Sequence, residues 1–148
     1  MKKYDEYQIF MKYKCANHSF NLLTGLLLVN AFLGVRLGSR WEWGTMKEVE
    51  VLVILLIASL FNTIISVYHN AWYTKVNEKR GYMWFFLISG IINLTFTIEY
   101  FISNPNSLLI NGKIGFEIFK LMPALLGLSI SIPYFIREWN EKRMEKNE

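Results

Sequence analysis

The sequence predicts an all-α protein: an integral membrane four-helix bundle whose spans run antiparallel, up and down. No formally charged residue lies between Lys14 and Arg36, or between Glu50 and Lys75. A helix needs about 20 residues to cross roughly 30 Å of hydrocarbon, so each of these stretches can supply one span. The composition is 53% hydrophobic and 16% aromatic. Four such helices in succession would have no polar face to present to water, which favours a bilayer.

Two further apolar stretches complete the predicted set of spans. The stretch from Arg80 to Lys113 contains Glu99 as its single charged residue. The last stretch ends at Arg137 and is expected to begin near Ile114, because its uncharged part alone is too short to cross the bilayer. The predicted spans are about 17–37, 49–70, 82–103 and 114–136.

The positions of lysine and arginine predict the orientation, because cytoplasmic loops near spans carry an excess of these residues. One side of the predicted bundle holds Lys2, Lys3, Lys12, Lys14, Lys75, Lys79, Arg80, Arg137, Lys142, Arg143 and Lys146. The other side holds Arg36, Arg40, Lys47, Lys113 and Lys120. Both termini are therefore expected in the cytoplasm, with the chain crossing the cell membrane several times.

The segments outside the predicted spans are short. Residues 1–16 are expected to form a cytoplasmic amphipathic segment, because Tyr4, Tyr7 and Met11 recur at helical spacing among charged residues. Residues 17–136 make up the predicted membrane domain, and residues 137–148 a charged cytoplasmic tail. The outer loop with the pair Asn111–Gly112 is rich in turn residues, so it is expected to be either structureless or a hairpin.

Charge, cysteine content and motifs argue against several function classes. The net charge is +4, but the basic residues are dispersed over the flanks of spans, so no nucleic-acid partner is expected. Cys15 is the single cysteine, so no intrachain disulfide can form. His18 and His69 have no third ligand of the right type, so no metal or cofactor is expected. No catalytic motif is present, and the chain is not expected to be an enzyme.

Polar side chains inside the spans are the candidate functional groups, because each is costly in hydrocarbon. Asn30, Asn62 and Asn93 fall at similar depths near the predicted midplane, where they could meet Ser129. One interpretation is that these residues are hydrogen-bonding contacts between helices, each worth about 0.6 kcal/mol. The other interpretation is a site for a small polar solute or ion.

Glu99 and Lys120 are the candidates for an ion pair within the membrane, since both lie near the outer ends of neighbouring antiparallel spans. Glu117 lies one helical turn before Lys120 and offers a competing partner. The long stem of Lys120 could also reach the outer headgroups. A functional pair and a simple accommodation at the interface both remain open.

Small residues mark two candidate helix contacts. In the fourth span Ala124, Gly127 and Ser131 share one face, along which a neighbouring helix could approach closely. In the first span, polar and small residues fall on two opposite sides, of which one could face the bundle and the other a second copy or a partner. One side holds His18, Asn21 and Gly25; the other holds Asn30 and the GxxxG pair Gly34 and Gly38.

The first half of the chain resembles a family of small four-span membrane proteins of Gram-positive bacteria. The resemblance rests on Asp5, Glu6, Tyr7 and Gln8 ahead of Lys12 and Lys14, on Ser19 and Phe20 opening a span that contains Asn30, and on tryptophan before the second span. It extends to about Tyr73. The resemblance implies a bacterial integral membrane protein and carries over no activity or site residue.

Two functions from different classes are compatible with these residues. The first is an accessory or interaction subunit of a membrane complex, with lipid around it and a homodimer or a larger assembly as partner. The second is a small homo-oligomeric transporter or channel for a small polar solute or ion. The two differ in the state of the polar groups, which are paired and dry in the first case and line a wet path in the second.

Overall fold

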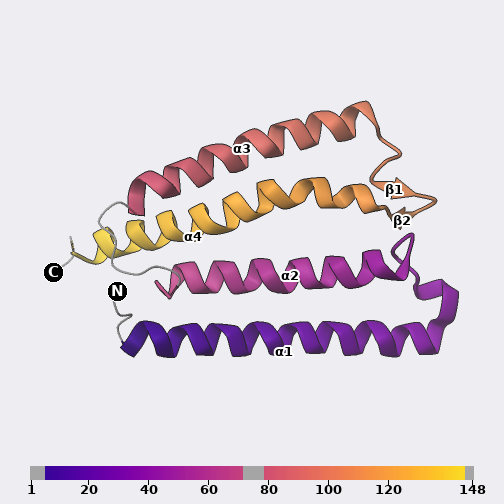
Figure 1. Ribbon diagram of the computed structural model, residues 1–148, viewed down its shortest axis with the longest axis horizontal. Coiled ribbons are helices and arrows are strands. Elements are labelled where there is room, and N and C mark those ends of the chain that lie inside the picture. The colour runs from indigo at the N-terminus through magenta and orange to yellow at the C-terminus, as the bar shows by residue number, and fades with distance from the viewer. Residues whose placement is uncertain (1–5, 72–78, 146–148) are drawn as a thin grey trace.

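The computed structural model describes residues 6–71 and 79–145 (Figure 1). Its elements are α1 (Glu6–Leu37), the 3-10 helix η1 (Gly38–Trp41), α2 (Lys47–Tyr68), α3 (Lys79–Ser103), β1 (Leu109–Ile110), β2 (Lys113–Ile114), the 3-10 helix η2 (Phe116–Leu121) and α4 (Met122–Glu145). The predicted all-α class is confirmed. The described residues contain four helices that are long and apolar enough to cross a membrane, as the sequence predicts.

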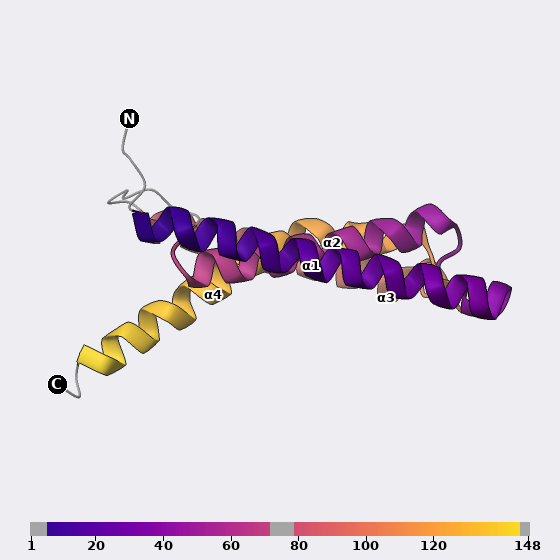
Figure 2. The ribbon, with the colours of Figure 1, turned by 90° about the horizontal axis from the view of Figure 1, so that it is seen from below.

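The four long helices lie side by side in one row, in the order α1, α2, α4, α3 (Figure 1). Helix α4 packs against both α2 and α3, whereas α1 packs mainly against α2. Seen at right angles to this view, the helices overlap one another, which shows that the row is thin (Figure 2). The helices therefore form an open layer, with α1 and α3 at its two edges. The start of α1 and the end of α4 lie at the same end of the row (Figure 1).

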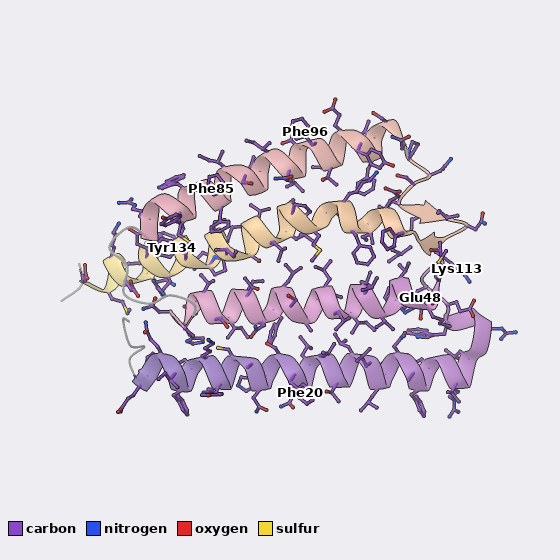
Figure 3. The ribbon with its side chains drawn as sticks, viewed as in Figure 1. Phe20, Glu48, Phe85, Phe96, Lys113 and Tyr134 are labelled. Carbon is purple, nitrogen blue, oxygen red and sulfur yellow. The ribbon has the colours of Figure 1, made fainter. Side chains whose placement is uncertain are left out.

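Large apolar side chains remain exposed along both edges of the row. Phe20 on α1 and Phe85 and Phe96 on α3 are each 65% exposed (Figure 3). The main buried cluster is small and lies where α2, α3 and α4 meet. It consists of Val67, Met83, Ile130 and Tyr134.

Helix α1 is continuous from Glu6, so residues 6–16 are the first turns of the same helix that contains the predicted first span. Its buried residues Gln8, Met11, Cys15 and Ser19 recur every three or four positions and form the face against α2. Met11 is buried, as its place in the predicted amphipathic pattern suggests, whereas Tyr7 is 59% exposed. Tyr4 of the same pattern lies outside the described residues.

Helix α2 ends in a left-handed residue. Asn70 has φ +57°, and the N–H of Ala71 donates to the carbonyl of Ser66 at 2.8 Å. This pattern satisfies carbonyl groups that the last turn of a helix leaves free. The Asn70 carbonyl in turn accepts a hydrogen bond from the side chain of Gln8 at 3.2 Å, which ties the end of α2 to the start of α1.

The hairpin alternative for the second outer loop is confirmed. Strands β1 and β2 pair in antiparallel fashion, and Asn111 and Gly112 between them have φ +53° and +77°. Two positive φ angles in succession define the turn that joins two-residue hairpins, and an Asn-Gly pair favours it.

The fourth span was expected to begin near Ile114, and the candidate span of the structure begins at Phe116. Ile114 belongs to β2, where it takes part in the hairpin ladder instead of a helix. The tighter η2 follows, and α4 begins at Met122. Pro123 stands in the first turn of α4, where a proline without an N–H is tolerated, so the regular helix begins there.

Helix α4 extends through the predicted tail to Glu145. Pro133 lies inside it and cannot donate to the carbonyl of Ser129, which is the usual cause of a sharp kink. Beyond this point the helix diverges from the row (Figure 2). The salt bridge between Glu138 and Lys142 measures 2.7 Å and has the spacing that the sequence predicts for this segment.

Candidate functional site

An extensive polar site, centred on Glu50, lies at the end of the row opposite the start of α1 and the end of α4; we call this end the outer end. This residue is 1% exposed although it is acidic. Its Oε1 accepts the backbone N–H groups of Trp43 at 3.1 Å and of Gly44 at 3.2 Å. A carboxylate oxygen has more than one lone pair, so Oε1 can accept both N–H groups at once. Glu50 thereby fixes the loop that joins α1 to α2.

Asn30 connects this carboxylate to two tryptophans. Its Nδ2 donates to Oε2 of Glu50 at 3.3 Å. Its Oδ1 accepts the indole N–H of Trp41 at 3.0 Å and that of Trp43 at 2.8 Å. Both lone pairs of the amide oxygen are therefore used. We call Asn30, Trp41, Trp43 and Glu50 the outer network.

The outer network is joined to the hairpin before η2. The N–H of Ile114 donates to the Trp43 carbonyl at 2.7 Å, and the N–H of Thr45 donates to the Ile114 carbonyl at 2.9 Å. Lys113 on β2 forms a 2.8 Å salt bridge with Glu42 (Figure 3 labels Lys113). This hydrogen-bonded ammonium group holds the pKa of Glu42 below its ordinary value of 4.5. The two outer loops thus form one connected surface.

A cavity of about 190 Å³ lies beside Glu50, lined by Glu42, Gly44, Thr45, Met46, Lys47 and Glu50. The Nζ of Lys47 lies 3.7 Å from Glu42 and 3.8 Å from Glu50, so it places a positive charge between two carboxylates. Gly44 is required by this packing, because a Cβ there would lie 2.8 Å from the side chain of Glu50.

The predicted cluster of three asparagines does not form. Asn30 belongs to the outer network, Asn62 is bonded to Ser19 and Ser66, and Asn93 is bonded to Ser89 of its own helix. Ser129 donates to the carbonyl of Leu126 within α4. The asparagines stay apart because α1 and α3 lie at opposite edges of the row (Figure 1). Residues at equal depth along these two helices therefore do not meet.

Of the predicted ion-pair residues, Lys120 and Glu117 meet and Glu99 does not join them. Lys120 Nζ lies 2.5 Å from a carboxylate oxygen of Glu117 and 3.4 Å from the centre of the Tyr100 ring. The Tyr100 hydroxyl donates to Glu117 at 3.3 Å. Glu99 is exposed on α3. The short 3-10 helix η2 brings Glu117 and Lys120 together, so the salt bridge of Lys120 is formed within η2.

The predicted close contact along the fourth span lies between α3 and α4. Ala124 and Ser131 are both 0% exposed. A Cβ on Gly127 would lie 2.8 Å from the Phe86 carbonyl oxygen and 3.0 Å from the Cα of Gly90. Small residues allow two backbones to approach in this way. Gly90 on α3 is the partner that sequence analysis missed, because a single small residue in an apolar span has no distinctive spacing.

The structure shows which of the two polar sides of α1 faces the rest of the protein, a choice that the sequence left open. Asn30 faces α2, whereas His18, Asn21 and Gly25 are exposed on the opposite side of α1. Gly38 lies outside α1 with φ +57°, and a Cβ on Gly34 would meet no atom within 4 Å. The GxxxG pair therefore makes no close helix contact within the described residues.

A second polar feature lies in the groove between α1 and α2, toward the end of the row that carries the start of α1. Two cavities of about 280 Å³ each share Ala16 and Asn62 in their lining. The first is also lined by Lys12, Ser66 and Ala71, and the second by Ser19, Phe20, Leu23, Leu55, Ala58 and Ser59. We call this pair of cavities the α1/α2 groove.

Glu50 is the functional residue that sequence analysis missed, because it was taken as the polar boundary of the second span. The available signal was its helical spacing: Glu50, Ile54 and Ala58 are four residues apart, and all three are buried. A carboxylate in line with buried apolar residues indicates a partner inside the protein.

Comparison with known proteins adds no identification: no protein-family model, no curated protein and no solved structure matches the chain. Within the described residues, no three His, Cys, Asp or Glu side chains are grouped so that they could hold a metal ion. The described residues thus combine fixed loops at one end of the row, locally paired polar groups and exposed apolar side chains along the edge helices.

Proposed function

We propose that the chain is a multi-pass protein of the plasma membrane with both termini in the cytoplasm. The length and apolar composition of the four helices support insertion, as do the exposed phenylalanines at the edges of the row. The distribution of lysine and arginine supports the orientation, because the end with the start of α1 carries the larger number of them.

Within that membrane the chain acts as an interaction subunit that binds a second copy or a larger membrane complex. The observation that carries this proposal is the uncovered side of α1, where His18, Asn21 and Gly25 are exposed. A polar side chain in a span is costly against lipid and is usually turned toward protein. A small residue beside it allows another helix to approach closely. The outer network supports this role as well, because it fixes the loops on which such a partner could rest.

The test is the size of the complex purified from membranes in a mild detergent, measured by light scattering together with chromatography. We expect a particle larger than one chain, which Gly25→Leu reduces toward the monomer. Gly34→Leu, on the α2 side of the same helix and with open space around it, is the matched control and should leave the size unchanged. A wild-type monomer that carries no other protein would refute the proposal. Loss of the complex on Gly34→Leu alone would place the contact on the other side.

The alternative function, a small homo-oligomeric transporter or channel, is supported by one feature, the α1/α2 groove with Asn62 at its base. A transport path needs polar groups that converge on water, and Asn30 and Asn93 are bonded elsewhere. In proteoliposomes, the interaction role predicts that Asn62→Leu changes no solute or ion flux. A flux that this variant abolishes while the helical content stays intact would favour transport.

A further inference from the structure

The α1/α2 groove changes in character along its length. Toward the start of α1 it is lined by Lys12, Asn62 and Ser66, and farther along by Phe20, Leu23 and Leu55. Lys12 and Leu23 are eleven residues apart, which corresponds to about 17 Å along the helix axis. A groove with a cationic and hydrogen-bonding end and an apolar end matches a ligand that has an anionic head and a hydrocarbon chain.

Asn62 provides hydrogen-bonding capacity for such a ligand. Hydroxyl oxygens of Ser19 and Ser66 lie 3.2 and 3.5 Å from its Oδ1. A carboxamide has two donors and two lone pairs, and the two serines occupy only one end of it, whichever way the oxygen and nitrogen are assigned. Asn62 lines both cavities, so its other end is available to a ligand there. There it can bind the oxygen atoms of a phosphate or an ester.

The charge and position of Lys12 indicate which headgroup the ligand carries. Lys12 lies at the mouth of the groove near the start of α1, the end that the proposed orientation puts at the cytoplasmic leaflet. Anionic headgroups of that leaflet attract lysine side chains at the membrane surface. A second groove in the protein offers a contrast: the cavity of about 480 Å³ between α2 and α4 is lined mainly by leucine, isoleucine and proline and contains no charged residue.

We propose that the α1/α2 groove binds one anionic phospholipid of the cytoplasmic leaflet, with the phosphate between Lys12 and Asn62 and one acyl chain along Phe20, Leu23 and Leu55. This inference rests on the proposed membrane orientation and is independent of any protein partner. Lipid binding and oligomeric size are measured separately, so that one proposal can fail while the other stands.

The test uses the full chain, stripped of lipid in a non-ionic detergent, and native mass spectrometry to count bound molecules. The probes are dioctanoyl phosphatidylglycerol, dioctanoyl phosphatidylcholine and inorganic phosphate, each titrated separately. We expect one phosphatidylglycerol per chain, bound about fivefold more tightly than phosphatidylcholine, since one lysine near an anionic head contributes about that factor. Inorganic phosphate, which has no chain to bury, should leave the protein unloaded and should not displace the lipid.

Two pairs of variants locate the binding. Ala16→Phe fills the groove from α1 and should weaken phosphatidylglycerol binding by about tenfold or more; Ala31→Phe, also exposed on α1 but outside the groove lining, should not. Lys12→Gln should remove the preference for the anionic head, whereas Lys14→Gln should keep it. Ser59→Phe blocks the same groove from α2 and provides a second test should Ala16→Phe lose its helical circular dichroism.

Three results would overturn the proposal. The first is equal binding of phosphatidylglycerol by wild type and by the folded blocking variants. The second is equal affinity for phosphatidylglycerol and phosphatidylcholine in the wild type. The third is binding of inorganic phosphate in competition with the lipid, which would make the groove an ion site.

Discussion

Asn30 of α1 donates a hydrogen bond to Glu50 of α2 at 3.3 Å, and through this contact a buried carboxylate is connected to the indole groups of Trp41 and Trp43. The two residues are twenty positions apart and join the last turns of one helix to the first turn of the next. The loop between the helices is therefore held at its base by side chains of both. The contact adds to the hydrogen bonds of Ile114 and the salt bridge of Lys113, which also hold this loop.

Substitution of Glu50 is expected to destabilise the protein more than substitution of its exposed neighbour. The amide oxygen of Glu50→Gln can still accept the N–H groups of Trp43 and Gly44, but its N–H₂ group then faces the Asn30 Nδ2 donor and the Lys47 ammonium group. Loss of hydrogen bonds to a charged group costs about 1.5–3 kcal/mol. Thermal unfolding in detergent should show a lower midpoint for Glu50→Gln, while Glu48→Gln, exposed in the same helical turn, should match the wild type. Equal midpoints for the two variants would contradict the role given to Glu50.

Removal of the Asn30 amide should be visible in tryptophan fluorescence. Asn30→Leu leaves the indole N–H groups of Trp41 and Trp43 without their acceptor, so both rings lose a fixed polar environment. We expect a shift of the emission maximum and faster quenching by an aqueous quencher. Asn93→Leu is the matched control, because that amide is bonded only within α3. Emission that stays unchanged in Asn30→Leu would show that the indole groups do not depend on this residue.

The close approach of α3 and α4 predicts that even one methyl group is harmful at Gly127. An alanine there would place its Cβ 2.8 Å from a backbone oxygen of α3, which forces the helices apart. Overpacking of this kind typically costs about 1–3 kcal/mol. Gly81→Ala, at a position with no atom within 4 Å, should be neutral or slightly stabilising. The measurement is again the unfolding midpoint, and a Gly127→Ala variant as stable as Gly81→Ala would be inconsistent with the contact.

Acid should loosen the hairpin through Glu42. Its pKa is lowered by the hydrogen bond with Lys113, so the folded state favours the carboxylate. The stabilisation is therefore fully present above the ordinary pKa of 4.5 and is lost as the pH falls through the lower folded value. Hydrogen exchange of β1 and β2, corrected for the intrinsic rate, should be the same at pH 7 and at about pH 5 and should rise below about pH 4. In Glu42→Gln this change should be absent, and its persistence would assign the acid effect to another group.

The fold class could be predicted from the sequence because it depends on length and hydropathy alone. Helix α2 runs over 47–68 where 49–70 was expected, and α3 over 79–103 where 82–103 was expected. The fourth candidate span begins at Phe116 where a start near Ile114 was expected. Ile114 itself lies in a strand, because the turn at Asn111 and Gly112 pairs it in a hairpin. The turn-forming residues, and not the hydrophobicity of Ile114, therefore determine that this residue precedes the helix.

The site was harder to predict because it depends on which helices are neighbours. Depth along each span gave similar levels for Asn30, Asn62 and Asn93, but it contains no information on lateral position. The contact of α4 with α2, which separates α2 from α3, is a tertiary relationship with no signal in the spacing of residues. Glu50 was missed for a different reason: it was taken as the boundary of the second span, although its spacing with Ile54 and Ala58 indicates a buried position.

The order of the row has a consequence for biosynthesis. Ribosomes deliver α3 before α4, yet the main neighbour of α3 is α4, and α4 also lies between α3 and the earlier pair. If the chain is inserted in a bilayer as proposed, the surface of α3 that carries Gly90 contacts only acyl chains until α4 follows. In a nascent chain that stops before Met122, α1 and α2 should therefore still pack against each other. Helix α3 should lack its packing partner and become a substrate for quality-control proteases.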